Sequence, residues 1–319
     1  MRGGRIKIRG VDAVYHCMSR TVNGERSLGV RHREVLQRML LKVAEFSGVR
    51  VITYCLMENH FHVLVRVPGV DRPSDKELVR RFRLLYPKPG LYQPMSADRL
   101  ELVLSKGGAE AESLRRVLLA RMGDVSEFMK TLKQRFSIWF NQFEKRFGPV
   151  WSDRFKSVLV EGGHSSLKTV AAYIDLNPVR AGIVRDPGEY AFSGFGKAST
   201  GRQFELEGIR SLGGGRALQI SEYRNILRGK GELSGGGRDS GVGDFDRDSN
   251  ELLKRNRYFT NGKILGSEGF VRDLLEGMLV FHEATRRRRC PMSVGVAGGV
   301  FAGTSVRRRK TCQREVEKV

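Results

Sequence analysis

Two histidines stand two residues apart in the stretch from Met57 to Val65, which reads Met-Glu-Asn-His-Phe-His-Val-Leu-Val. The pattern is typical of a β-strand, whose successive side chains point to opposite faces. His60 and His62 therefore share one face with Leu64. Paired imidazoles at this spacing predict a platform for a divalent cation, and a strand with two structural histidines is the alternative interpretation.

A site built on two imidazoles needs further donors. Two imidazoles leave most of an octahedral shell open, which suits Mg2+ or Mn2+ holding a phosphate oxygen as well. A carboxamide or a carboxylate would finish the shell. A tyrosine could then attack the polarised phosphate, although its hydroxyl, with a pKa near about 10, also needs a proton acceptor. Such an attack would give a covalent phosphotyrosine and a free 3′ hydroxyl, so the cut strand could be rejoined without ATP.

The charge of the chain points to a polyanionic partner. Its 319 residues include 57 Lys and Arg against 35 Asp and Glu, a formal net charge of +22. Neutralising phosphates releases counterions and drives binding, so nucleic acid is the leading candidate. An anionic membrane surface and a merely soluble basic protein are the alternatives.

The sequence predicts a cytoplasmic protein with reduced thiols. It holds no apolar run of membrane-spanning length, and its first residues lack the apolar core of a signal peptide. The cysteines are scattered, without the close pairs of a zinc site or a dense disulfide framework. They are Cys17, Cys55, Cys290 and Cys312.

Strands and helices must position the histidines. Residues 13–19 are rich in strand formers, and 31–46 carry apolar residues at helical spacing that Gly48 ends. Two strand-like runs, 49–56 and 60–67, are joined by a short connection and predict an antiparallel hairpin. The histidines would lie near its turn.

Further helices follow, and one of them carries a tyrosine and a carboxamide. Helices are predicted over 74–85 and 109–147, and a strand over 155–160. The next helix should start after Gly162-Gly163, with Ser165 or Ser166 as its cap, and end near Asn177 because Pro178 follows. Tyr173 and Asn177 are four residues apart, so they should project from one face of that helix.

Composition changes beyond about residue 194. We interpret 1–195 as the catalytic domain, 196–250 as a Gly/Ser-rich linker with short helices, and 251–319 as a basic C-terminal extension, helical and then disordered. Helices are expected over 221–227 and 268–283. The arginine clusters at 286–289 and 307–310 would either grip phosphate or form a solvated tail.

Four motifs make the sequence resemble the REP-associated tyrosine transposases, a branch of the single-tyrosine HUH transposases that cut and join single-stranded DNA. The resemblance covers about residues 1 to 195. The motifs are Tyr15-His-Cys-Met-Ser-Arg20, Leu56-Met-Glu-Asn-His-Phe-His-Val63, Gly148-Pro-Val-Trp-Ser-Asp-Arg-Phe-Lys-Ser157 and Tyr173-Ile-Asp-Leu-Asn-Pro-Val-Arg-Ala-Gly-Ile-Val184.

The resemblance implies a role for each matching residue. His60 and His62 fall on the metal-binding pair, and Tyr173 falls on the nucleophile that becomes linked to a 5′ phosphate. Asn177 holds the position from which relatives complete the metal shell, often with glutamine, whose reach is one methylene longer. Other tyrosines and histidines are rivals for these roles, with packing or structural roles as the alternative: Tyr15, Tyr54, Tyr190, His16 and His164.

Basic residues in and near the motifs are candidate contacts to DNA phosphates. Arg154, Lys156 and Arg180 lie inside the motifs, with a fold-maintaining ion pair as the alternative for each. Lys133 and Arg135 lie on the predicted helix 109–147 as a backbone-binding edge.

The resemblance also implies a fold, a reaction and a partner. The expected fold is α+β, an antiparallel sheet with packed helices of the ferredoxin-like or RRM-like HUH endonuclease kind, followed by a poorly defined C-terminal extension. The expected activity is metal-dependent cleavage and strand transfer on single-stranded or hairpin DNA. The expected location is the nucleoid, with no membrane partner. The chain could act as a homodimer. Two alternatives stay open: a catalytically silent binder of repeat hairpins, and a metal-dependent hydrolase that uses activated water.

Overall fold

One sheet runs through the computed structural model, which describes residues 6–8, 10–69, 72–91, 93–229, 258–261, 263–283, 289–297 and 300–307. The strand order is β2-β3-β1-β4-β5-β7-β6, and neighbours pair antiparallel except for the parallel pair β4 and β5. The strands are β1 (Ala13–Arg20), β2 (Arg50–Leu56), β3 (His60–Val67), β4 (Lys156–Val160), β5 (Ile264–Gly266), β6 (Arg289–Ala297) and β7 (Val300–Arg307).

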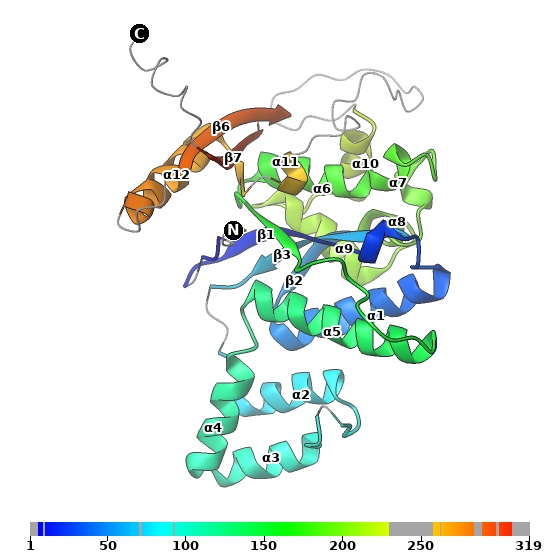
Figure 1. Ribbon diagram of the computed structural model, residues 1–319, viewed down its shortest axis with the longest axis vertical. Helices are drawn as coiled ribbons and strands as arrows, with labels where there is room; N and C mark the ends of the chain where they lie inside the picture. Colours follow the sequence, from blue (N-terminus) through cyan, green and yellow to red (C-terminus); the bar gives the residue numbers. More distant parts are fainter. Residues whose placement is uncertain are drawn as a thin grey trace.

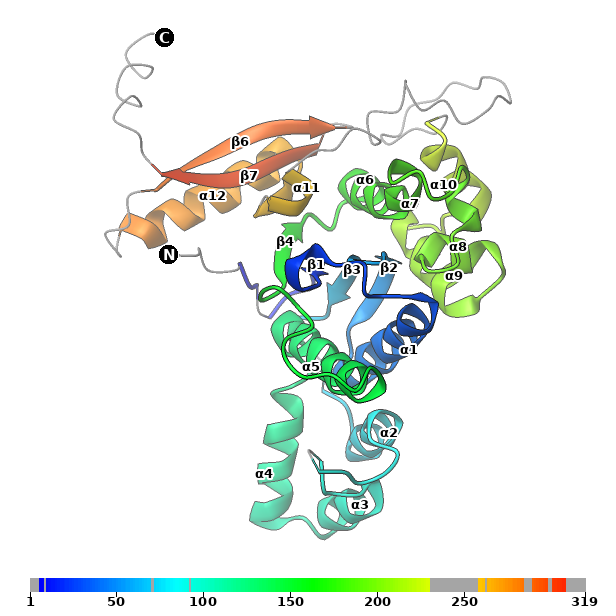
Figure 2. The same ribbon diagram turned by 45° about the vertical axis from the view of Figure 1, so that its right-hand side comes forward.

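The first four strands have the expected ferredoxin-like arrangement. Helix α1 (Val30–Ser47) links β1 to β2, and α5 (Val125–Phe143) precedes β4. Both helices lie on one face of the sheet, where their apolar sides meet one face of the strands in a shared core (Figures 1 and 2). The β-α-β-β-α-β order with the strand order β2-β3-β1-β4 confirms the predicted α+β class.

The predicted hairpin of β2 and β3 is confirmed, with His60 as the first residue of β3. The turn is closed by the Met57 N–H, which donates to the His60 carbonyl at 2.8 Å. Across the sheet, His62 is paired with Met18 of β1 and Cys55 of β2. This register fixes which strand positions share a face with the histidines.

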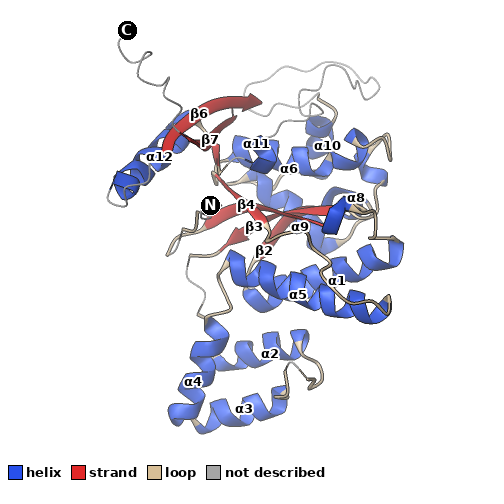
Figure 3. Ribbon diagram, viewed as in Figure 1, coloured by secondary structure: helices blue, strands red, loops and turns tan. Residues whose placement is uncertain are grey.

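The predicted helix over 109–147 is two helices, and a third precedes it. Helices α2 (Asp75–Leu85), α3 (Ala97–Lys106) and α4 (Gly108–Leu119) form a lobe that projects beyond α1 and α5 (Figure 3). The chain breaks at Gly123, which has a φ of 59°. Asp124 then caps α5, because its carboxylate accepts from the N–H groups of Ser126 and Glu127 at 2.6 and 3.1 Å.

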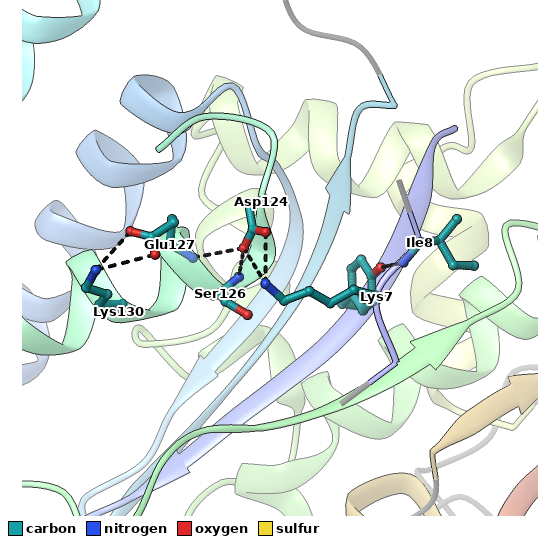
Figure 4. A network of polar contacts seen from close by, with 7 residues as sticks. Lys7, Ile8, Asp124, Ser126, Glu127 and Lys130 are labelled. Atoms are coloured by element: carbon teal, nitrogen blue, oxygen red, sulfur yellow. Dashed lines mark hydrogen bonds and ion pairs between the residues drawn. The ribbon is translucent and has the colours of Figure 1, made fainter. Parts of the chain in front are cut away.

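Asp124 also holds the N-terminal arm against α5. Lys7 Nζ lies 2.9 Å from its carboxylate, and the Ile8 N–H donates to the Tyr15 hydroxyl at 2.9 Å (Figure 4). Burial raises the pKa of Asp124, but Lys7 and the two capping N–H groups outweigh it, and the pKa is lowered. Tyr15, a rival for the nucleophile, thus has a structural partner.

Helix α6 (His164–Asp175) covers the opposite face of the sheet from α1 and α5 (Figure 2). It begins earlier than predicted, with Gly163 rather than Ser165 or Ser166 as its N-cap. Ser166 instead donates its hydroxyl to Glu161 at 3.0 Å. The short α7 (Asn177–Arg180) follows at once, with Pro178 in its first turn, where a missing N–H costs nothing.

Residues after the predicted domain end at 195 continue to cover this face. Helices α8 (Gly194–Ser199), α9 (Gln203–Arg210) and α10 (Ile220–Leu227) bury Phe195, Ile209 and Tyr223 in the same core as α6. The expected linker is therefore packed structure as far as residue 229, and its remainder lies outside the described residues. The 3-10 turns are η1 (Val22–Gly24), η2 (Pro187–Glu189) and η3 (Ser211–Gly213).

The C-terminal part adds strands to the sheet. Beside β5, β6 and β7 lie α11 (Tyr258–Asn261) and α12 (Glu268–Glu283), the latter at the predicted position. Glu161 joins this part to the centre, since it accepts from the Ser267 N–H at 2.6 Å. The basic residues at 286–288 and 308–310 lie outside the described residues. None of the helices in the described part is both long and apolar enough to span a bilayer.

Candidate functional site

His60 and His62 lie on the sheet face that α6 covers. His60 pairs with Arg20 across the ladder and His62 with Met18, and Met18 belongs to the core under α6. His62 is buried and His60 is half-buried at the strand end. Their ring centroids are 5.1 Å apart with the planes nearly perpendicular at 88°. The two imidazoles thus form a pair, as predicted.

A third histidine joins them from β1. His16 Nε2 lies 2.9 Å from His62 Nδ1, a hydrogen bond in which the donor depends on the tautomers. Burial lowers the pKa of His16 to about 4, and burial followed by the neighbouring His16 and His60 holds the pKa of His62 well below its usual range. Both rings are therefore neutral near pH 7, the state in which imidazole binds metals. From the sequence alone, we considered His16 only as a rival for the metal-binding role.

Helix α6 brings Tyr173 to the same place. The Tyr173 ring centroid is 6.3 Å from that of His16 and 6.4 Å from that of His62. The helix is held there because Val170, Ala171 and Ile174 pack onto the sheet in the core that includes Leu64. The pair of histidines and the tyrosine, far apart in sequence, thus meet on one face of the sheet.

A buried carboxylate fastens the end of α6 that carries Tyr173. Asp175 accepts hydrogen bonds from Thr53 Oγ1 at 2.9 Å, the Tyr223 hydroxyl at 2.8 Å and the Phe195 N–H at 3.2 Å. Burial raises the pKa of Asp175 to about 7, against the effect of these donors. One side chain therefore ties α6 to β2, α8 and α10.

The Tyr173 ring lies between two side chains and is only 4% exposed. Phe259 of α11 stacks on it with centroids 4.2 Å apart and planes at 13°. The Arg180 guanidinium carbon lies 4.3 Å from the ring centroid. Phe259 comes from the C-terminal part, and no motif in the sequence pointed to it.

Asn177 is engaged with its own helix end. Its Nδ2 donates to the carbonyls of Tyr173 and Ile174 at 3.2 and 3.1 Å, and its Oδ1 accepts from Arg180 Nη1 at 2.9 Å. An amide oxygen has a second lone pair, which could still reach a cation. That cation would lie close to the positive charge of Arg180. An anion such as a phosphate, bridging the cation and Arg180, would favour cation binding there. The role of Asn177 as a ligand stays a prediction.

The donors present fit a cation that takes most of its ligands from elsewhere. The Nδ1 of His60 lies 2.6 Å from Asn59 Oδ1, and that of His62 lies against His16. A metal-binding imidazole commonly has its other nitrogen held in this way, and binds through Nε2. Among the described residues, no group of three or more His, Cys, Asp or Glu side chains could hold a metal by itself. The remaining positions would fall to amide, phosphate and water oxygens.

Basic residues lie on the sheet face of the histidine pair and in the loop before β4. Lys156 opposes Met18 across the ladder, so it faces the same side as His62, and Arg154 is exposed in the preceding loop. Arg180 stacks on Tyr173 as described. Arg20, which sequence analysis did not single out, opposes His60, and its charge, like that of Arg180, contributes to the low pKa of His62.

Lys133 and Arg135 lie on α5, on the other face of the sheet. Lys133 Nζ donates to the Asp153 carbonyl at 2.6 Å, beside the Trp151 ring. Arg135 donates to the Leu85 carbonyl at 3.1 Å and lies over the Tyr86 ring. In this structure both residues make contacts within the fold, apart from the histidine pair. The side chain of His164 lies outside what the structure describes.

Comparison with known proteins adds a likeness to a solved structure. Neither a family model nor a curated protein matches the chain. Among solved structures, the chain is similar to a REP-associated tyrosine transposase bound to a REP hairpin, with 14% identity and a TM-score of 0.40 over 77% of this chain and 98% of that one. A likeness at this level bears on neither the substrate nor the reacting residues of this chain.

Proposed function

We propose that the chain is a metal-dependent endonuclease and strand transferase for single-stranded DNA, acting on hairpin-forming repeats through a covalent 5′-phosphotyrosine at Tyr173. The observation that supports the proposal is that the Tyr173 ring lies 6.4 Å from the His62 ring, which in turn lies 5.1 Å from the His60 ring. The sequence motifs point to the same residues. The proposed partner is DNA in the cytoplasm or nucleoid, and a homodimer is expected only from the resemblance.

The proposed step exchanges one phosphate ester for another. The Tyr173 oxygen forms a bond to phosphorus, and the bond from phosphorus to the 3′ oxygen breaks with its electron pair going to that oxygen. The phenolic proton is lost and the 3′ oxygen gains one, so no net proton is consumed. A divalent ion, Mg2+ or Mn2+, held by His60 and His62 with Asn177, would polarise the phosphate.

The chain's own residues would bind and orient the strand. Arg20, Lys156 and Arg180 offer positive charge on the sheet face of the histidines, where a phosphodiester must lie for Tyr173 to reach it. Because Tyr173 is only 4% exposed, attack requires the stack of Phe259, Tyr173 and Arg180 to open. DNA binding would supply that opening through the arginine.

Incubation with single-stranded hairpin DNA and Mn2+ or Mg2+ tests the proposal. We expect a DNA-linked protein band on a denaturing gel that needs the metal and disappears in Tyr173→Phe. An adduct that persists in Tyr173→Phe would exclude this nucleophile. Cleavage without an adduct in that variant would instead identify a hydrolase that activates water.

A catalytically silent binder of hairpin DNA is the second candidate. It is favoured by one feature, the enclosure of Tyr173 by Phe259 and Arg180 together with the use of the Asn177 oxygen by Arg180. This candidate predicts binding of hairpin DNA with the same affinity in Tyr173→Phe and no adduct in either protein, whatever metal is added.

A further inference from the structure

The hydrogen bond between His16 and His62 joins two buried imidazoles, so it has a ring nitrogen at each end. His16 is 0% exposed and His62 is 4% exposed, and the nitrogens are 2.9 Å apart. Water does not compete for such a contact, so a single proton between the two nitrogens decides the tautomer of both rings.

The two arrangements of that proton differ in consequence. If His62 Nδ1 carries the proton, His62 donates to His16 and its Nε2 keeps a lone pair for a cation. If His16 Nε2 carries it, neutral His62 has its proton on Nε2, where the proton blocks a metal bond. Only the first arrangement is competent to bind a cation through His62 Nε2.

We infer that His16 is a positioning residue, which accepts the Nδ1 proton of His62 and so presents His62 Nε2 to the divalent cation. The inference rests on the proposed metal site and deepens it. His16 does not touch the cation or the DNA; it fixes the tautomer and the ring orientation of the residue that does.

The surroundings of His16 favour this arrangement. When its Nε2 accepts, its own proton is on Nδ1, which forms no hydrogen bond of normal geometry among the described residues. The Phe259 backbone raises the pKa of His16, against the larger effect of burial, which lowers it. Phe259, which stacks on Tyr173, would thus act on the histidine pair as well.

Two substitutions at residue 16 separate the role from simple packing. His16→Phe keeps a ring of similar size but removes the acceptor, whereas His16→Gln places a carbonyl oxygen near the position of Nε2. His32→Gln is the matched control. His32 belongs to α1, on the other face of the sheet, and its ring is hydrogen-bonded to Glu144 at 2.7 Å. Far-UV circular dichroism and the dispersion of amide resonances would check that each variant is folded.

The first readout needs neither metal nor DNA. Long-range nitrogen–proton correlation spectra at neutral pH report which nitrogen of His62 is protonated, after assignment with His62→Gln. We expect the Nδ1–H tautomer in the wild type, in His16→Gln and in His32→Gln, and a mixture with Nε2–H in His16→Phe. Nδ1–H in all four folded proteins, or Nε2–H in the wild type, would overturn the inference.

The second readout is the affinity for Mn2+ alone, measured by the electron paramagnetic resonance signal of free Mn2+. We expect His16→Phe to bind about 10- to 100-fold more weakly than the wild type, the usual cost of losing such a partner, and His16→Gln to recover most of the affinity. Equal affinity in His16→Phe and wild type would contradict the inference. A wild type that binds no Mn2+ would refute the proposed metal site. The tautomer spectra would still test whether His16 accepts the Nδ1 proton of His62.

Discussion

Tyr173 is the residue on which the proposed reaction depends, and its neighbours explain both its position and its enclosure. Asp175 fixes the helix end, Arg180 covers one face of the ring and Phe259 covers the other. The spacing of His60 and His62 on a strand was enough to predict their shared face. The stacking of Phe259 on Tyr173 could not be predicted, because Phe259 belongs to a segment distant in sequence that carries no motif.

Arg180 should matter through its planar guanidinium. It donates to Asn177 Oδ1 at 2.9 Å and to the Tyr173 carbonyl at 3.2 Å while it stacks on the ring. We expect Arg180→Ala to lower the free energy of unfolding by about 1.5–3 kcal/mol, the range for hydrogen bonds to a charged group. Because an ammonium cannot reproduce the fork and the stack, Arg180→Lys should recover less than half of it.

Urea denaturation followed by circular dichroism measures the free energy of unfolding of both Arg180 variants. Full recovery of stability by Arg180→Lys would show that only the charge matters at this position. The same variants, tested with hairpin DNA, report whether the guanidinium also holds a phosphate.

At the scale of elements, the hairpin and the helices on either side of the sheet followed from sequence patterns. Gly48 ended α1 as expected, with a φ of 67°. The break between α4 and α5 was missed because apolar periodicity continues across Gly123, and only the cap made by Asp124 defines the new start. The packing of α8, α9 and α10 was missed because each helix is short and flanked by glycine, so its burial depends on tertiary contacts.

Asp124 gives a test of the α5 cap. We expect Asp124→Ala to cost about 1–2 kcal/mol of stability, whereas Asp124→Asn should lose less because Asn still caps a helix. The pKa of Asp124 is lowered in the folded chain, so its charge adds stability above the pKa of the same carboxyl in the unfolded chain, about 3.9. That stability is lost as pH falls through the pKa of the folded chain.

Unfolding free energies measured from pH 7 to pH 2 test whether the stability contributed by Asp124 falls toward acid pH. The difference between wild type and Asp124→Asn should be constant above about pH 5 and shrink below about pH 4. A difference that grows toward acid pH would mean that burial, rather than Lys7 and the capping N–H groups, dominates the pKa of Asp124.

At the scale of the whole molecule, the net charge of +22 predicts salt-dependent binding to nucleic acid, and the structure says which charges face the histidine pair. Arg20 and Lys156 oppose His60 and Met18 across β1 and its neighbours, whereas Lys133 and Arg135 lie on the opposite face. Sequence position alone could not separate these groups, because the face of a residue depends on how distant strands pair.

Binding of hairpin DNA should therefore respond unequally to loss of these charges. We expect Arg20→Ala and Lys156→Ala each to weaken binding and to reduce the slope of log K against log salt by about 1, the loss of roughly one phosphate contact. Arg83→Ala, which removes an exposed charge on α2, is the control and should change neither. Fluorescence anisotropy over a salt series measures the slopes, and an equal effect of all three variants would contradict a binding surface at the histidine pair.

The proposed reaction makes Tyr173 the covalent link to DNA. The most direct measurement is peptide mass spectrometry of the protein after reaction with hairpin DNA and Mn2+, followed by nuclease digestion of the bound strand. We expect a peptide containing Tyr173 that carries a 5′-linked nucleotide, absent without the metal and absent in His62→Gln. A nucleotide found on another residue, such as Tyr15, Tyr54 or Tyr190, or cleaved DNA with no modified peptide, would contradict it.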